Sequence, residues 1–248
     1  MAKRPQFETD QIYHVFNRGV EKRDTYNEEA DYFRFIYSLY ECNDKNAVVM
    51  RDRIKERIKR NVIGPTYVNY QGPTLVNSER ELLVEVIAFT LMPNHYHLIV
   101  RQLIDDGISL FMKKLGNAYV GYFNEKYKRS GMGSLFQGKF KAVHIKKDEQ
   151  FIYLVWYVFT NPLDLLDKNW RNEGIKDTKE AIGYMRSYKW SSYLDCIGIK
   201  NFPSVTSRDF LMNSFDREKG IKNFIEEGVF EESRIKNNLN RAKDLILE

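Results

Sequence analysis

The segment from Leu82 to Arg101 constrains the fold more than any other part of the chain. Leu82 to Met92 and His95 to Arg101 are both rich in residues that favour extended strands, and the turn signal Pro93-Asn94 separates them. Two such runs around a short turn predict a β-hairpin. The other predicted elements lie before and after this hairpin in the sequence.

Strand and helix patterns continue on both sides of the hairpin. Ile12 to Asn17 is typical of a strand, and Asn27 is a candidate N-cap for the helix that follows it. Phe136 to Ile145 is a further strand candidate, and Asp148 precedes a helix that Pro162 stops. Between the hairpin and that strand, apolar residues recur every three or four positions, which predicts an amphipathic helix with this stripe: Ile108, Phe111, Met112, Leu115, Tyr119 and Tyr122.

The predicted elements follow the order β-α-β-β-α-β, with one more helix after the last strand. This is the split βαβ order of an α+β, ferredoxin-like fold, in which helices cover an antiparallel sheet. The closing helix would be an addition to that core. We expect one domain over residues 1–195 and a partly helical C-terminal extension over residues 196–248.

Residues 43–80 interrupt this pattern and are predicted to be an insertion. Arg51 to Arg60 holds six basic residues against Asp52 and Glu56, and a Gly/Pro/Asn-rich stretch follows it. The simpler interpretation of the charged run is a solvated helical face. The alternative is a contact with DNA.

Charge is informative in its distribution rather than its total. The chain has 248 residues, enough for a substantial core, and 39 Lys and Arg against 34 Asp and Glu, which permits a polyanionic partner without requiring one. Residues 126–147, however, contain seven basic side chains and no Asp or Glu. This basic strip predicts phosphate contacts, and its candidate DNA-binding residues are Arg129, Lys139, Lys141, Lys146 and Lys147.

The chain shows no targeting signal that would place it in or across a membrane. Its N-terminus lacks an apolar signal core, and no apolar run approaches the roughly 18 residues that suggest a membrane span. We therefore expect a cytoplasmic protein that does not bind membranes. Cys42 and Cys196 are isolated, so a disulfide framework or a cysteine-based zinc site is not expected, and both are interpreted as packing residues.

The second run of the hairpin carries two histidines at strand spacing. His95 and His97 are two residues apart, so their imidazoles point to one face of the strand and can bind one metal ion. Tyr96, Leu98 and Val100 point to the other face, where they can pack on the core. Two polar residues on an exposed sheet face would be the plainer interpretation of the same pattern.

A second pair of residues supports a chemical role for the histidines. Tyr157 and Asn161 are one helical turn apart and so share a helix face, which would place a nucleophile beside a metal ligand. The carbonyl oxygen of Asn161 is a hard donor that suits Mg²⁺ or Mn²⁺. Tyr157 alone is one of 16 tyrosines, and packing would be the plainer interpretation for it.

Five ordered motifs resemble those of the REP-associated tyrosine transposases, relatives of the insertion-sequence transposases that use one catalytic tyrosine. The motifs span residues 11–195 and are Tyr13-His14-Val15-Phe16-Asn17-Arg18-Gly19, Met92-Pro93-Asn94-His95-Tyr96-His97-Leu98-Ile99, Phe136-Gln137-Gly138-Lys139-Phe140, Tyr157-Val158-Phe159-Thr160-Asn161-Pro162 and Trp190-Ser191-Ser192-Tyr193. The chain departs from many relatives in two ways: Phe159 stands where they have a histidine, and Leu163-Asp164-Leu165 follows the Asn-Pro where they have a small or basic pattern.

The resemblance implies a metal-dependent single-stranded DNA endonuclease and strand transferase of the HUH class. His95, His97 and Asn161 would be its metal ligands for Mg²⁺ or Mn²⁺, and Tyr157 would attack DNA at or near a hairpin to form a 5′-phosphotyrosine link. The partner would be single-stranded or hairpin DNA. Relatives include dimers and monomers, so the oligomeric state stays open.

Two other functions fit parts of the sequence. A metallohydrolase would use His95 and His97, with His14 or His144 as a third zinc ligand, to activate water. A non-catalytic nucleic-acid-binding module would use only the fold and the basic strip. A gel that traps protein covalently on single-stranded DNA distinguishes all three.

Overall fold

The described part of the chain forms a four-stranded antiparallel sheet. The computed structural model describes residues 5–48, 52 and 80–230. Its strands are β1 (Ile12–Arg18), β2 (Val84–Met92), β3 (His95–Gln102) and β4 (Lys141–Ile145), and they lie in the order β2-β3-β1-β4. With a helix after β1 and another after β3, this arrangement confirms the predicted split βαβ fold and the predicted hairpin.

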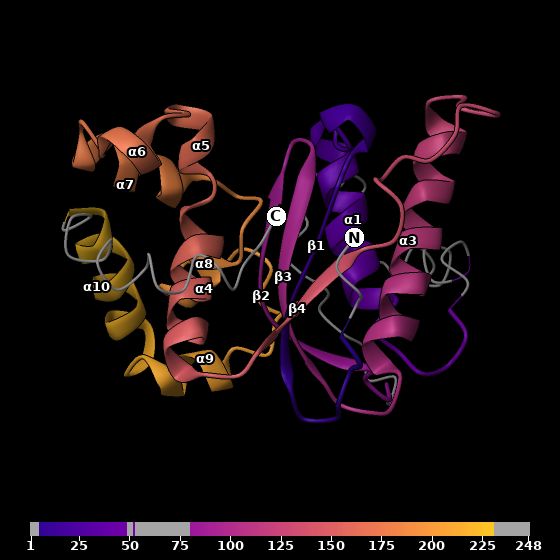
Figure 1. Cartoon of the computed structure of the whole chain (residues 1–248), viewed down its shortest axis with the longest axis horizontal. Coiled ribbons are helices and arrows are strands. Elements are labelled where there is room, and N and C mark those ends of the chain that lie inside the picture. The colour runs from indigo at the N-terminus through magenta and orange to yellow at the C-terminus, as the bar shows by residue number, and fades with distance from the viewer. Residues whose placement is uncertain (1–4, 49–51, 53–79, 231–248) are drawn as a thin grey trace.

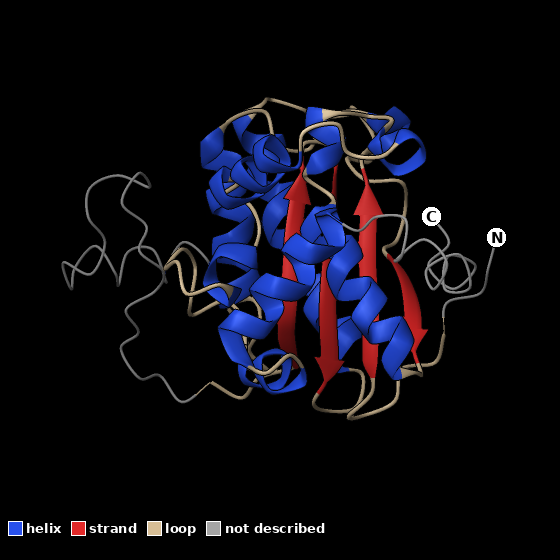
Figure 2. Ribbon diagram, turned by 90° about the vertical axis from the view of Figure 1, so that its left-hand side faces the viewer, coloured by secondary structure: helices blue, strands red, loops and turns tan. Residues whose placement is uncertain are grey.

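Helices cover both faces of the sheet (Figure 1). Helices α1 (Glu29–Glu41) and α3 (Gly107–Lys126) pack together on one face, and α4 (Asp148–Thr160) packs on the other. Figure 2 shows the four strands with helices in front of them. The remaining short or C-terminal helices are η1 (Val20–Lys22), α5 (Leu163–Leu166), α6 (Trp170–Glu173), α7 (Thr178–Ser187), α8 (Tyr193–Cys196), α9 (Asp209–Ser214) and α10 (Arg217–Phe230).

Strand alternation divides the interior into two apolar cores. On β3, Leu98 and Val100 belong to the core under α1 and α3, whereas Ile99 belongs to the core under α4. Successive strand residues point to opposite faces, so each strand must be apolar on both sides when both faces are covered. A polar side chain in the middle of the α4 face of β3, such as His97, is therefore enclosed by protein.

Two element boundaries differ from the sequence expectation. The last strand begins at Lys141 rather than Phe136, because Gly138 has a φ of 73°, which interrupts an extended backbone, and Phe136 forms only an isolated bridge with Gly19. Helix α1 has Glu28 as its N-cap rather than Asn27. Such shifts of a few residues are usual at element ends.

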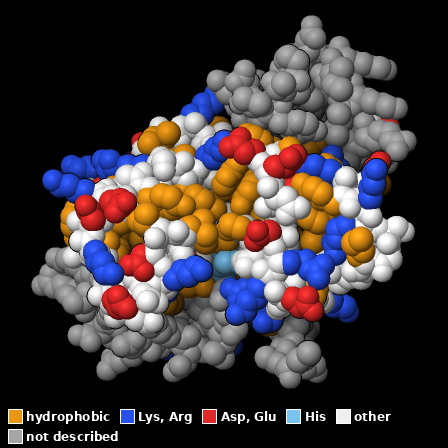
Figure 3. All heavy atoms as spheres, turned by 90° about the horizontal axis from the view of Figure 1, so that it is seen from above, with side chains coloured by type: hydrophobic (Ala, Val, Ile, Leu, Met, Phe, Trp, Pro, Cys, Tyr) orange, Lys and Arg blue, Asp and Glu red, His pale blue; other side chains and the backbone are white. Residues whose placement is uncertain are grey.

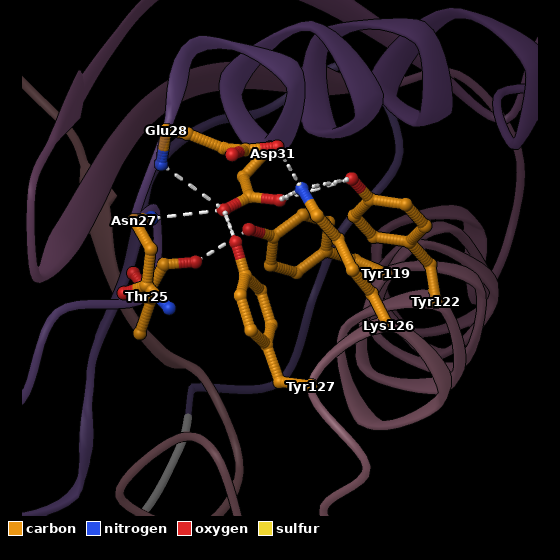
Figure 4. Close-up of polar contacts among 8 residues, drawn as sticks. All are labelled: Thr25, Asn27, Glu28, Asp31, Tyr119, Tyr122, Lys126 and Tyr127. Atoms are coloured by element: carbon orange, nitrogen blue, oxygen red, sulfur yellow. Dashed lines mark hydrogen bonds and ion pairs between the residues drawn. The ribbon is translucent and has the colours of Figure 1, made fainter.

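A buried carboxylate ties α1 to the end of α3 (Figure 4). The side chain of Asp31 is fully buried and accepts hydrogen bonds from the backbone N–H groups of Asn27 and Glu28, from the hydroxyls of Tyr122 and Tyr127, and from Lys126 Nζ at 2.6 Å. Burial by itself would raise the pKa of Asp31, but these donors outweigh it and hold that pKa below the usual value of 3.8.

We expect Asp31→Asn to lower the free energy of unfolding by about 2–3 kcal/mol at pH 7, because Lys126 loses its buried carboxylate partner and keeps Glu28 and the Tyr122 hydroxyl. A carboxyl whose pKa is lower in the folded than in the unfolded protein stabilises the fold fully at pH values above the unfolded-state pKa. This stabilisation is lost as the pH falls through the folded-state pKa. The difference between parent and variant should therefore shrink below about pH 4. Urea unfolding at pH 7 and pH 3 measures it, and a constant difference would contradict this account.

The Trp190-Ser191-Ser192 segment closes the outer edge of the sheet. Thr90 of β2 forms a bridge with Ser191, and the backbone N–H of Phe89 donates to Ser192 Oγ at 2.9 Å. Trp190 stacks on Tyr32 of α1, with ring centroids 4.4 Å apart. This motif therefore has a structural role, because it occupies the exposed edge of β2 and links that edge to α1.

The segment after residue 195 packs with the rest of the chain up to residue 230. Ile221, Ile225 and Val229 of α10 are buried in the same core as α4.

Cys42 and Cys196 are buried and unpaired, as expected of packing residues. Within the described ranges, no helix has the length and apolar character of a membrane span. Except for residue 52, the charged run from Arg51 to Arg60 lies outside the described residues. Residues 231–248 also lie outside them.

Candidate active site

Strand β3 places both histidines of the H-x-H pattern on the face that α4 covers. His97 is fully buried and His95 is half-buried, while Tyr96 and Leu98 lie in the opposite core. The two imidazole centroids are 5.0 Å apart and nearly perpendicular, at 88°. The pair is therefore not an exposed polar face of the sheet.

Hydrogen bonds orient both imidazoles through the same ring nitrogen. His97 Nδ1 lies 2.9 Å from His14 Nε2 on the neighbouring strand β1, and His95 Nδ1 lies 2.6 Å from Asn94 Oδ1. With Nδ1 engaged in each ring, Nε2 is the atom that would bind a metal ion. Ligand histidines in proteins are commonly held in this way.

Burial also sets the charge state of the histidines. It lowers the pKa of His14 to about 3 and the pKa of His97 well below 6.5, and for His97 the neighbouring His95, His14, Arg171 and Arg18 lower it further. Both rings are therefore neutral at physiological pH. A neutral imidazole is the form that binds a metal ion.

Helix α4 brings Tyr157 against the histidines. Its ring centroid lies 5.2 Å from that of His97 in an edge-on arrangement and 6.2 Å from that of His14. Tyr157 is half-buried, whereas Tyr153, one turn earlier, is buried. Of these two α4 tyrosines, Tyr157 is the more accessible to a substrate.

Asn161 continues the turn that carries Tyr157. It is helical, with φ −50° and ψ −40°, although the residue before a proline is biased away from that region. Its side-chain nitrogen donates to the Tyr157 carbonyl at 3.2 Å, so the amide oxygen is the side-chain atom that could bind a metal ion. Asn161 is buried, and its role as a ligand stays a prediction.

A pocket opens beside the two histidines and joins three of the sequence motifs. Its lining residues are Phe16, Asn17, Arg18, His95, Tyr96, His97, Gln137 and Lys141. Arg18 lies opposite His95 in the β1–β3 register, and the Gln137 N–H donates to the Arg18 carbonyl at 2.8 Å. Arg18 and Gln137 were in quoted motifs, but the sequence pattern assigned them no role.

Some side chains of the basic strip are exposed, and others are buried or contact other parts of the protein. Lys139, Lys141, Lys146 and Lys147 are exposed, and Lys141 also lines the pocket. Arg129 is buried, its guanidinium lies 5.6 Å from the Phe123 ring centre, and this placement does not favour the predicted DNA contact. Viewed from above, a histidine is visible at the surface with Lys and Arg side chains nearby and a broad area of hydrophobic side chains beside it (Figure 3).

One cationic side chain near Tyr157 could not be predicted from the sequence pattern. Arg171 of α6 lies with its guanidinium carbon 4.9 Å from the Tyr157 ring centre. It is 14 residues away along the chain and separated from α4 by the Pro162 turn, so helical spacing does not relate the two. Only the packing of α6 against α4 brings it to the site.

The remaining histidines do not supply a third zinc ligand. His14 Nε2 is bonded to His97 Nδ1, and His144 stacks on Tyr13 on the opposite face of the sheet, with ring centroids 4.7 Å apart. In the part of the chain that the structure describes, no three His, Cys, Asp or Glu side chains are grouped as a metal site. His14 and His144 are therefore not placed to join His95 and His97 as a third ligand.

A comparison with protein families matches this part of the chain. The family model described as "Transposase IS200 like" matches residues 74–161. This chain carries an IS200-like transposase domain. The matched range of the transposase domain includes both histidines, Tyr157 and Asn161, whereas His14 and Arg171 lie outside it. No curated protein matches the chain.

Two solved structures show a more distant likeness to this chain. One is a REP-associated tyrosine transposase bound to a REP hairpin, with a TM-score of 0.46 and 13% identity, covering 84% of this chain and 92% of that one. The other is tRNA(His) guanylyltransferase from Saccharomyces cerevisiae, with a TM-score of 0.34 and 12% identity, covering 75% of each chain.

Proposed function

We propose that the protein cleaves single-stranded DNA at or near a hairpin and transfers the strand through a covalent link to Tyr157. The observation that carries this proposal is the contact between the Tyr157 ring and His97, 5.2 Å between centroids, which joins a nucleophile on α4 to the H-x-H pair on β3. The two lie 60 residues apart in the sequence. Tyr157 thereby lies against a buried histidine whose pKa burial holds well below 6.5.

The donor set fits a hard divalent cation. His95 and His97 would supply Nε2, and Asn161 would supply its amide oxygen, which leaves positions for water and a phosphate oxygen. A bound Mg²⁺ or Mn²⁺ would polarise the scissile phosphate and offset the charge that develops on it.

The residues of the chain then perform an in-line displacement. Tyr157 Oη forms a bond to phosphorus and loses its proton, while the bond from phosphorus to the 3′ oxygen breaks and that oxygen takes up a proton. The products are a 5′-phosphotyrosine link and a free 3′-hydroxyl. One phosphodiester replaces another, so a 3′-hydroxyl from a second strand can reverse the step and complete transfer without ATP.

The exposed lysines around β4 define the proposed path of the DNA backbone. Lys141 lines the pocket beside the histidines, and Lys139, Lys146 and Lys147 lie on either side of it along the chain. Clustered cations attract phosphates without reading sequence. The path therefore leads the strand to Tyr157 but does not determine the recognised bases.

Neutralising Lys139 and Lys141 together to Gln should make DNA binding less sensitive to salt. Each lost single-strand phosphate contact lowers the slope of log Kd against log salt concentration by about 0.7, so the double variant should be shallower by about 1.4. Fluorescence anisotropy at several salt concentrations measures the slope. Lys200 and Lys219 are also exposed and serve as a control pair. An unchanged slope would move the DNA path elsewhere, with Arg51 to Arg60 the next candidate.

Covalent trapping tests the proposed function directly. The protein is incubated with Mg²⁺ or Mn²⁺ and a pool of single-stranded DNA hairpins that carry randomised flanking sequences, and the products are separated on a denaturing gel. We expect DNA to migrate with the protein, and sequencing the trapped strands identifies the substrate. Cleavage without an adduct would favour a hydrolase, and binding without cleavage would favour a non-catalytic module.

A further inference from the structure

Arg171 is held in a fixed position next to the proposed nucleophile. Its Nε donates to Asp164 Oδ1 at 3.1 Å, and the Trp170 indole N–H donates to the same oxygen at 2.7 Å. Trp170 is buried and packs against Trp156 of α4, with ring centroids 5.6 Å apart. These contacts anchor the guanidinium to the helix that carries Tyr157.

The anchor uses only one edge of the guanidinium. Among the described residues, Arg171 forms hydrogen bonds through Nε alone, and Nη2 is a buried donor with no protein acceptor. A buried N–H without an acceptor is costly, so natural structures seldom keep one without a reason. Arginine is also the side chain whose paired terminal donors best match the oxygens of a phosphate.

Arg171 lies beside the ring of the proposed nucleophile. Its guanidinium carbon is 4.9 Å from the Tyr157 ring centre, and the same ring centre lies 5.2 Å from that of His97. A phosphate that the phenolic oxygen attacks must approach this ring at its hydroxyl. The cation is therefore close to both the nucleophile and the histidine that would hold the metal ion.

We propose that Arg171 is a substrate-binding residue whose guanidinium contacts the scissile phosphate beside the hydroxyl of Tyr157. This inference rests on the proposed strand-transfer function and assigns a task to the helices that follow the transposase domain. The contact would strengthen as negative charge builds on the phosphate oxygens during attack, so its main effect would be on kcat.

The test uses the full chain and the hairpin strand identified by trapping. Arg171→Met should lower kcat for adduct formation by about 10²–10³-fold, as expected for one lost donor to a developing anion, with a much smaller change in KM. Lys176→Met is the matched control, because Lys176 is an exposed cation five residues later, and its ion-pair partner among the described residues is Glu173 at 3.7 Å. It should react at the parental rate.

Two further measurements distinguish phosphate contact from a packing role. Free guanidinium ion, but not an equal concentration of sodium, should restore part of the activity of Arg171→Ala. A methylphosphonate at the scissile position, which removes the phosphate charge, should slow the parent far more than it slows Arg171→Met, because the two changes remove one interaction.

The outcomes separate this inference from the function on which it rests. If the parent forms the adduct and Arg171→Met forms it at the same rate, or if methylphosphonate slows both proteins equally, Arg171 is only a clamp between α5 and α6. If the parent itself forms no adduct with any hairpin, the proposed function fails and the inference fails with it.

Discussion

Tyr157→Phe should bind hairpin DNA about as tightly as the parent and form no covalent adduct with it. Phenylalanine keeps the ring that contacts His97 and Arg171 and lacks only the oxygen that would attack phosphorus. Because Tyr157 is half-buried, the loss of its hydroxyl should change the free energy of unfolding little. Loss of the nucleophile should reduce the cleavage rate by at least about 10⁴-fold.

End-labelled DNA makes this result specific to the proposed chemistry. With the parent protein, label 3′ of the cut should migrate with the protein on a denaturing gel, and label 5′ of the cut should appear on a shorter free strand. A hydrolase that activates water would keep cutting after Tyr157→Phe and would never trap DNA.

Tyr153→Phe is the matched control for the nucleophile. Tyr153 lies one turn earlier on α4, with its ring centroid 6.2 Å from that of Tyr157, but burial encloses it and raises its pKa. This variant should keep adduct formation. An adduct that survives Tyr157→Phe and disappears with Tyr153→Phe would transfer the role to Tyr153 and remove the rationale for Asn161 as a neighbouring ligand.

Replacing both His95 and His97 by Ala should abolish Mn²⁺ binding and DNA cleavage together. Outer-shell partners of a metal alone contribute about 10–100-fold to affinity, so each direct ligand should contribute more than that. His95→Ala is the cleaner single variant, because His95 is half-buried, whereas His97→Ala also opens a cavity and leaves His14 without its partner. Calorimetry with Mn²⁺ measures the affinity, and thermal unfolding reports the fold.

His144→Ala provides the control for the metal experiment. His144 stacks on Tyr13 on the far side of the sheet, so its loss should leave Mn²⁺ affinity unchanged. Unchanged Mn²⁺ binding in the His95/His97 double variant would make the H-x-H pair structural. The same loss of affinity in His144→Ala would point to a general effect on the fold.

Local periodicity made most of the fold predictable. Alternation at two residues identified the β2–β3 hairpin, and spacing at three and four residues identified α3. The start of β4 was predicted too early, since a positive φ at Gly138 cannot be read from apolar residues on either side of it. Such a backbone conformation depends on the loop around it, not on its composition.

Charge patterns in the sequence were a weaker guide than periodicity. Residues 126–147 form one uninterrupted basic strip along the chain, but Lys126 pairs with Glu28 and Asp31, and Arg129 is buried. The residues that pair with Lys126 lie almost one hundred residues away in the sequence. A count of charges along a short segment therefore does not include them. The exposed lysines of the strip remain the predicted DNA contacts.

The sequence by itself determined the order of strands and helices and which residues share a face: His95 with His97, and Tyr157 with Asn161. These relations depend only on the repeat of a strand or a helix, which is local. Only the tertiary structure decided that α4 covers the histidine face of the sheet, that His14 orients His97, and that Arg171 lies beside Tyr157. Those contacts join segments far apart in the chain, and they depend on the packing of two cores on one sheet, which no local pattern encodes.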